Sequence, residues 1–188
     1  SGNVVVYAIN NGNITNSGTI TLGASTTATR SIGAIANTGT VTNNGNIVVN
    51  GQYGIGTYST GNSTINNSGD ITLTGKETIG NYGASASNIN VSSGTVTLTG
   101  NKSTGYYLAG GSNSTIDSGA KIDVSGNEAS GVYVNNNGSW AYSGATTVSG
   151  DAAYGLIVDG NSSVNAIGGT LTVNGTSGIH GTSSGANS

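Results

Sequence analysis

The sequence predicts an all-β fold, a parallel β-helix of about seven rungs of roughly 25 residues with three short strands in each rung. Three observations lead to this fold class. A short apolar phrase recurs with a nearly constant period, which is typical of a solenoid. Apolar and polar residues alternate within each phrase, as they do in strands. The 34 glycines, the absence of proline and the abundance of Asn, Ser and Thr favour turns over helices.

The recurring phrase supplies one inward strand of each rung. In residues 19–22, Ile20 and Leu22 fall on one face and the two threonines fall on the other. The second apolar residue of the phrase is Leu22, Val49, Leu73, Leu98, Val124, Val148 or Val173, and successive members are 24 to 27 residues apart. One period spans roughly 80 Å of extended chain, which is enough for three strands and three corners.

A second inward strand precedes the phrase. Counting back six residues from its first apolar position gives the column Ile14, Val41, Ile65, Ile116 and Trp140. Asn90 and Asn165 interrupt this column. At these two rungs the apolar residues have slipped by one position, to Ile89, Val91 and Val164.

A third inward strand begins at a glycine that lies two residues before a large side chain. The pairs are Gly33/Ile35, Gly56/Tyr58, Gly80/Tyr82, Gly105/Tyr107, Gly131/Tyr133, Gly155/Ile157 and Gly178/His180. The aliphatic members of this column favour an interior position, so the four tyrosines are predicted to form a structural ladder in the core, with the glycines making room beside the rings. The alternative is an aromatic strip on the surface that packs against sugar rings.

Residues 1–180 are predicted to form a single solenoid segment, and residues 181–188 to continue into a further rung or to be disordered. Neither end carries the polar capping unit that closes most solenoids. We therefore expect that this segment belongs to a longer protein.

Composition excludes several classes of function. A net charge of −3, from 7 acidic and 4 basic residues, leaves no basic patch for nucleic acid. The longest apolar run, residues 4–9, is far shorter than the ~20 residues of a membrane span, and no signal peptide is recognisable. Without cysteine there is neither a disulfide nor a thiolate metal site. Nothing in the sequence points to a cofactor or a metal.

Three phrases, at residues 14–23, 41–51 and 65–75, repeat the pattern of an apolar strand, an Asn/Ser/Gly corner and a second apolar strand. They resemble the passenger domains of monomeric type V autotransporters, large outer-membrane adhesins of bacteria, and the resemblance covers residues 14 to about 180. It implies a right-handed β-helix, a secretion signal and a C-terminal membrane β-barrel outside this segment. It also implies a place on the bacterial cell surface and a role in attachment and virulence.

Three aromatic residues are predicted to bind a ligand. Tyr106 falls in a column of mixed character beside the tyrosine column, which suggests partial exposure. Trp140 and Tyr142 lie on one face of a strand in a column of smaller residues. They form either a locally swollen core or an exposed aromatic pair that binds a partner.

The charged residues offer a surface ladder but no catalytic centre. Glu77, Lys102 and Glu128 occupy one column, which predicts alternating charges worth under ~1 kcal/mol per pair. Convergent carboxylates, as glycoside hydrolysis requires, are not expected, because the aspartates fall in different columns and mostly in different rungs: Asp70, Asp117, Asp123, Asp151 and Asp159. Arg30 is the only arginine, and His180 has no distinct nucleophile beside it.

The sequence therefore predicts a non-catalytic cell-surface adhesin segment that is monomeric. Its partners are expected to be glycans or proteins on host or bacterial surfaces. Two alternatives stay open: a pure stalk or spacer, and a β-helical module that processes polysaccharides, as in tailspikes and lyases.

Overall fold

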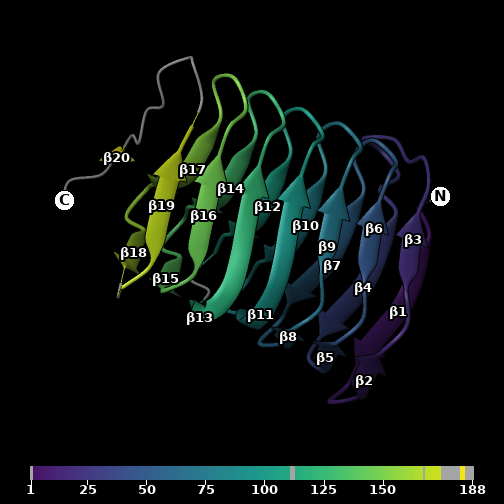
Figure 1. The fold of residues 1–188 in the computed structure, drawn as a ribbon. Coiled ribbons are helices and arrows are strands. Elements are labelled where there is room, and N and C mark those ends of the chain that lie inside the picture. The colour runs from purple at the N-terminus through teal and green to yellow at the C-terminus, as the bar shows by residue number, and fades with distance from the viewer. Residues whose placement is uncertain (1, 111–112, 167, 175–182, 185–188) are drawn as a thin grey trace.

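The computed structural model describes residues 2–110, 113–166, 168–174 and 183–184. These residues wind into a solenoid in which every paired strand is parallel to its neighbour (Figure 1). No helix occurs in the described part of the chain, and so none is available there to cross a membrane. The predicted parallel β-helix of about seven turns is confirmed.

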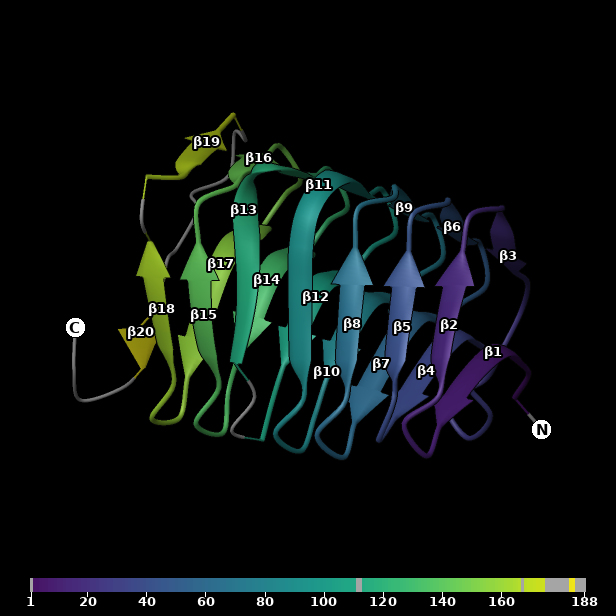
Figure 2. The ribbon, with the colours of Figure 1, turned by 90° about the horizontal axis from the view of Figure 1, so that it is seen from below.

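Each turn contributes strands to two sheets, whose faces lie on opposite sides of the core (Figure 2). The first sheet contains β1 (Val4–Ile9), β4 (Ile32–Asn37), β7 (Ile55–Thr60), β10 (Ile79–Gly83), β12 (Thr104–Leu108), β14 (Ser130–Val134), β17 (Tyr154–Asp159) and β20 (Ser183–Ser184). The second sheet contains β2 (Asn13–Asn16), β3 (Ile20–Leu22), β5 (Thr40–Asn43), β6 (Ile47–Val49), β8 (Thr64–Asn67), β9 (Ile71–Leu73), β11 (Asn88–Leu98), β13 (Asn113–Val124), β15 (Ser139–Tyr142), β16 (Ala145–Val148), β18 (Ser163–Ala166) and β19 (Thr170–Val173). The long strands β11 and β13 continue through a corner that other turns interrupt.

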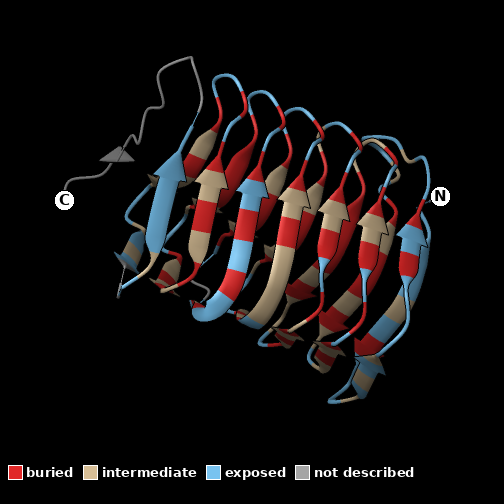
Figure 3. Ribbon diagram, in the orientation of Figure 1, coloured by how far each residue is buried: buried red, intermediate tan, exposed pale blue. Residues whose placement is uncertain are grey.

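The recurring phrase forms the strands β3, β6, β9, β16 and β19 and the second halves of β11 and β13. Its apolar residues point into the core, and Val49, Leu73 and Leu98 are completely buried. The register aligns them turn upon turn, as the period predicts (Figure 3). The large apolar side chains that are exposed all belong to the first and last described turns: Val4, Val5, Tyr7, Ile9, Leu171 and Val173.

The second inward column follows the prediction in one middle turn and differs from it in the next. Ile89, not Asn90, pairs with Ile65, as the predicted slip by one position requires. Ser114, and not the predicted Ile116, pairs with Trp140. The corner before the phrase contains additional residues in these turns, and the pairing of β11 with β13 shifts register there. A fixed count of six residues therefore fails, although the column of inward side chains continues without a break.

Candidate binding surface

The tyrosine column lies on the outer face of the first sheet. Its members Tyr58, Tyr82, Tyr107 and Tyr133 are register partners in β7, β10, β12 and β14. The residues on either side of Tyr58, Thr57 and Ser59, are completely buried, whereas the tyrosines are partly exposed. The predicted interior position is therefore wrong, although the four side chains do form a ladder.

The glycine that opens each strand explains the reversal. Gly56 and Thr57 are consecutive and both buried, so the alternation of inward and outward residues is interrupted between them. A Cβ atom added to Gly56 would lie 2.5 Å from the carbonyl oxygen of Gly80, so the glycine makes room for the backbone of the next turn and not for a ring. Alternation restarts at Thr57 and turns Tyr58 outward.

The four rings contact one another in sequence, and we call them the tyrosine stripe. The centroids of Tyr58 and Tyr82 are 5.1 Å apart, with the rings tilted by 54°. Tyr82 meets Tyr107 at 4.8 Å and 82°, and Tyr107 stacks on Tyr133 at 5.1 Å and 24°. Such aromatic contacts stabilise a fold by about 0.5–1.5 kcal/mol each.

The hydroxyl groups divide the tyrosine stripe into two halves. Asn135 Nδ2 donates a hydrogen bond to the Tyr107 hydroxyl at 2.9 Å, and the Tyr133 hydroxyl donates to Asp159 Oδ2 at 3.1 Å. Each of these bonds reaches into the next turn. The hydroxyls of Tyr58 and Tyr82 form no hydrogen bond with any described residue.

The Tyr82 and Tyr133 hydroxyls of the stripe have raised pKa values and are neutral hydrogen-bonding groups at physiological pH. Burial raises the pKa of Tyr82, the neighbouring Tyr107 and Tyr58 raise it further, and the positive charge of Arg30 acts in the opposite direction. Burial and the hydrogen bond to Asp159 raise the pKa of Tyr133. The stripe thus combines apolar ring surface with neutral donors.

Two of the three predicted ligand-binding residues lie deep in the core. Tyr106 is 0% exposed and Trp140 is 1% exposed, and their rings meet edge to face at 5.4 Å from opposite sheets. Neither side chain reaches a ligand on the surface, so the prediction is wrong for both. Burial raises the pKa of Tyr106 far above its usual range. The Tyr106 hydroxyl and Trp140 Nε1 have no hydrogen-bond partner among the described residues.

The core accommodates Trp140 through its smaller neighbour in the preceding turn. The register partner of Trp140 in β13 is Ser114, which is buried and takes little space. Ile116 pairs with Tyr142 instead. A small residue thus lies next to the large indole ring inside the core, which supports the interpretation that Trp140 locally enlarges the core and is not part of an exposed aromatic pair.

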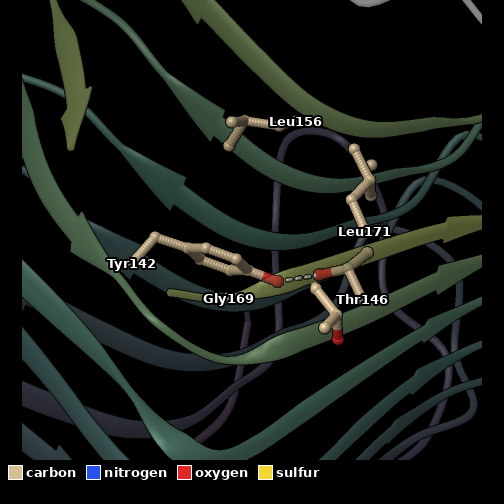
Figure 4. A pocket seen from close by; sticks show the side chains of 7 residues that line it. Tyr142, Thr146, Leu156, Gly169 and Leu171 are labelled. Atoms are coloured by element: carbon tan, nitrogen blue, oxygen red, sulfur yellow. Dashed lines mark hydrogen bonds between the residues drawn. The ribbon is translucent and has the colours of Figure 1, made fainter. Parts of the chain in front are cut away.

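Tyr142 is buried too, at 7% exposed, but it borders a cavity of about 120 Å³ at the last described turn (Figure 4). The lining is mainly apolar and is formed by Tyr142, Thr146, Gly155, Leu156, Gly169, Thr170 and Leu171. The Tyr142 hydroxyl is hydrogen-bonded to Thr146 Oγ1. The Tyr142 ring thus reaches this cavity, and it does so from inside the core.

The predicted charge ladder is formed in part. Lys102 Nζ lies 3.3 Å from Glu128 Oε2, but Glu77 pairs at 3.2 Å with its chain neighbour Lys76. Glu77, Lys102 and Glu128 occupy equivalent corner positions with left-handed backbone, at φ of 58°, 58° and 54°. The side chains of the Lys102–Glu128 pair are about half exposed, so the pair contributes little to stability.

The described residues bring no metal-binding group of side chains together. No group of three or more His, Asp or Glu side chains that could hold a metal converges within them. Asp117 and Asp123 both lie exposed on β13. His180 and the predicted tail at residues 181–188 lie largely outside the described residues, which include only residues 183–184 of that region.

Comparisons with known proteins do not identify a relative. No family model, no curated protein and no solved structure matches this chain.

Proposed function

We propose that this chain is a non-catalytic binding segment of a bacterial cell-surface adhesin, and that the tyrosine stripe contacts the partner. The observation that carries this proposal is the outward position of four contiguous tyrosines that the core does not require. Exposed aromatic rings pack against apolar faces of sugars and proteins, and tyrosine adds a hydrogen-bonding group. The resemblance to autotransporter passengers supports the cell-surface location.

A pure spacer is the second candidate. The hydrogen bonds of Tyr107 and Tyr133 to residues of the next turn favour it, because they link neighbouring turns and not a ligand. Regular stacking would then extend a distal binding site away from the cell. The two candidates differ in what the exposed rings do: in a spacer they only stabilise the stack.

The experiment is binding of the purified chain to a glycan array and to intact mammalian and bacterial cells. A Tyr82→Thr/Tyr107→Thr double variant removes the middle of the stripe and keeps residues suited to strands. Tyr53→Asn is the matched control, since Tyr53 lies off the stripe at a corner with φ of 63°, which asparagine tolerates.

Saturable binding that the double variant loses and the control keeps is the expected result, provided that circular dichroism shows both variants folded. Equal binding by all three proteins would move the contact surface away from the stripe. Absence of binding by the unchanged chain would favour the spacer.

A further inference from the structure

The partly exposed tyrosines are the side chains of this protein that a one-electron oxidant attacks most readily. The chain contains neither cysteine nor methionine, whose sulfur atoms are the usual targets of oxidants. Its one tryptophan, Trp140, is 1% exposed. Indole and phenol rings are the most easily oxidised groups that remain, and only phenol rings reach the surface in the described part of the chain. Oxidation of the folded protein is therefore directed to tyrosine.

The tyrosine stripe differs from the other accessible tyrosines because its rings contact one another. Tyr58 and Tyr82 are register partners in β7 and β10, and their ring centroids are 5.1 Å apart. Outside the stripe, Tyr7, Tyr53 and Tyr154 are at least partly exposed, but they make no ring contact with a described residue. A tyrosyl radical couples fastest with a ring that is already in contact, because the encounter no longer depends on diffusion. The stripe is thus the place where a radical finds a partner within the same molecule.

Within the stripe, Tyr58 and Tyr82 are the pair best suited to form a bond between rings. Coupling joins the two ring carbons next to the hydroxyl groups, so the rings have to turn these edges together and end tilted against each other. The 54° tilt of Tyr58 against Tyr82 is close to that arrangement, and neither hydroxyl is held by a hydrogen bond to a described residue. Tyr82 and Tyr107 lie nearly perpendicular, at 82°. Tyr107 and Tyr133 stack at 24°, and hydrogen bonds to residues of the next turn fix their hydroxyls.

We propose that one-electron oxidation joins Tyr58 and Tyr82 through a dityrosine bond, which links two neighbouring turns of the solenoid covalently and stabilises them. A peroxidase with hydrogen peroxide is the class of oxidant required. Each phenol loses one hydrogen atom, the two radicals couple through ring carbons, and the hydrogen on each of these carbons moves as a proton to the oxygen. Two hydrogen atoms leave the pair overall, and one molecule of hydrogen peroxide is reduced to two molecules of water. This modification depends on the contact between the rings and not on a ligand of the stripe, so it goes beyond the proposed function.

The test is oxidation of the folded chain by a haem peroxidase and limiting hydrogen peroxide, followed by purification of the monomer. Trypsin cleaves after Lys and Arg, so Tyr58 lies in the peptide of residues 31–76 and Tyr82 lies in that of residues 77–102. The other two tyrosines of the stripe lie in two further peptides. Mass spectrometry of the denatured and digested monomer therefore shows which tyrosines have coupled.

The variants are Tyr58→Phe, Tyr82→Phe and the control Tyr53→Phe. Tyr53 lies in the same tryptic peptide as Tyr58 and is partly exposed, so its replacement separates the two tyrosines of that peptide. Phenylalanine keeps each ring and removes the hydroxyl from which the hydrogen atom is taken. The unchanged chain oxidised in urea shows which links form without the fold.

A cross-link between the peptides of residues 31–76 and 77–102 is expected as the main product of the folded chain. It should be kept in Tyr53→Phe, lost in Tyr58→Phe and Tyr82→Phe, and no longer preferred in urea. The linked monomer should melt roughly 5–10 °C above the unoxidised chain, because the bond restricts the unfolded chain as a disulfide does.

A main product that joins other peptides would overturn the inference, as would coupling only between different molecules. A cross-link that Tyr53→Phe abolishes would do the same, because Tyr53 and not Tyr58 would then be the reacting residue. Equal melting temperatures of the linked and unoxidised monomers would overturn the stabilising effect of the bond.

Discussion

Replacing Tyr106 by phenylalanine is expected to stabilise the protein. The Tyr106 side chain is 0% exposed, and its hydroxyl has no hydrogen-bond partner among the described residues. A buried hydroxyl without a partner costs about 1–3 kcal/mol, because it has lost its bonds to water. Phenylalanine removes that group and keeps the edge-to-face contact with Trp140. We expect a gain of about 1–2 kcal/mol in the free energy of unfolding.

Urea unfolding followed by tryptophan fluorescence measures this gain directly, because Trp140 is the only tryptophan and its ring lies 5.4 Å from Tyr106. For a chain of this size the melting temperature should rise by about 3–6 °C. Tyr133→Phe is the control with the opposite sign, since it removes a hydroxyl that donates to Asp159 and should cost up to about 1 kcal/mol. A Tyr106→Phe variant less stable than the unchanged chain would refute the reasoning, because the hydroxyl would then have a stabilising partner.

Three further predictions concern pH, a buried amide and the surface charges. Burial raises the folded-state pKa of Tyr106 above its unfolded value near 10, so the free energy of unfolding should be unaffected by this group below pH 10 and should fall above it by up to about 1.4 kcal/mol per pH unit. In Tyr106→Phe, urea unfolding measured at several alkaline pH values should show a smaller fall. Asn43 is 0% exposed and its Nδ2 donates at 2.7 Å to Asn67 Oδ1, so Asn43→Ala should lower the free energy of unfolding in urea by about 2 kcal/mol. An unchanged unfolding midpoint would mean that this hydrogen bond between side-chain amides does not stabilise the fold. Lys102→Glu should lower the melting temperature in calorimetry by no more than about 3 °C, and 0.5 M salt should remove the difference if repulsion by Glu128 causes it.

The architecture could be predicted because every turn of the solenoid has to bury apolar residues at equivalent positions. Each occurrence of the phrase must present two apolar residues to one core, so the period and the alternation agree. Leu73 and Leu98 pair in register and are completely buried, as their column predicts. The corners between strands can vary in length from turn to turn without exposing the core. A fixed count of six residues therefore placed Ile116 in the wrong column.

The side of the sheet on which each tyrosine lies could not be read from the same pattern. A glycine has no side chain whose polarity indicates which face of the strand it lies on. The sequence therefore does not reveal that the alternation of inward and outward residues is interrupted between Gly56 and Thr57. The small residues on either side of each tyrosine could have predicted its outward position. Thr57 and Ser59 fit inside the narrow space between the sheets, and a tyrosine between them then has to point outward. Tyr106 breaks this rule because Trp140 from the opposite sheet packs against its ring.

The isoleucines that flank the tyrosine stripe indicate what the tyrosines add. Ile35 pairs with Tyr58 and Ile157 pairs with Tyr133, and both isoleucines are partly exposed on the same face. The fold therefore accepts an aliphatic side chain at this outward position, and apolar area alone does not require an aromatic ring. Rings and hydroxyl groups are what tyrosine contributes beyond isoleucine. Two of the four hydroxyls connect neighbouring turns, whereas those of Tyr58 and Tyr82 do not. The Tyr58–Tyr82 end of the stripe thus contributes least to the contacts between turns, and this favours recognition there over support.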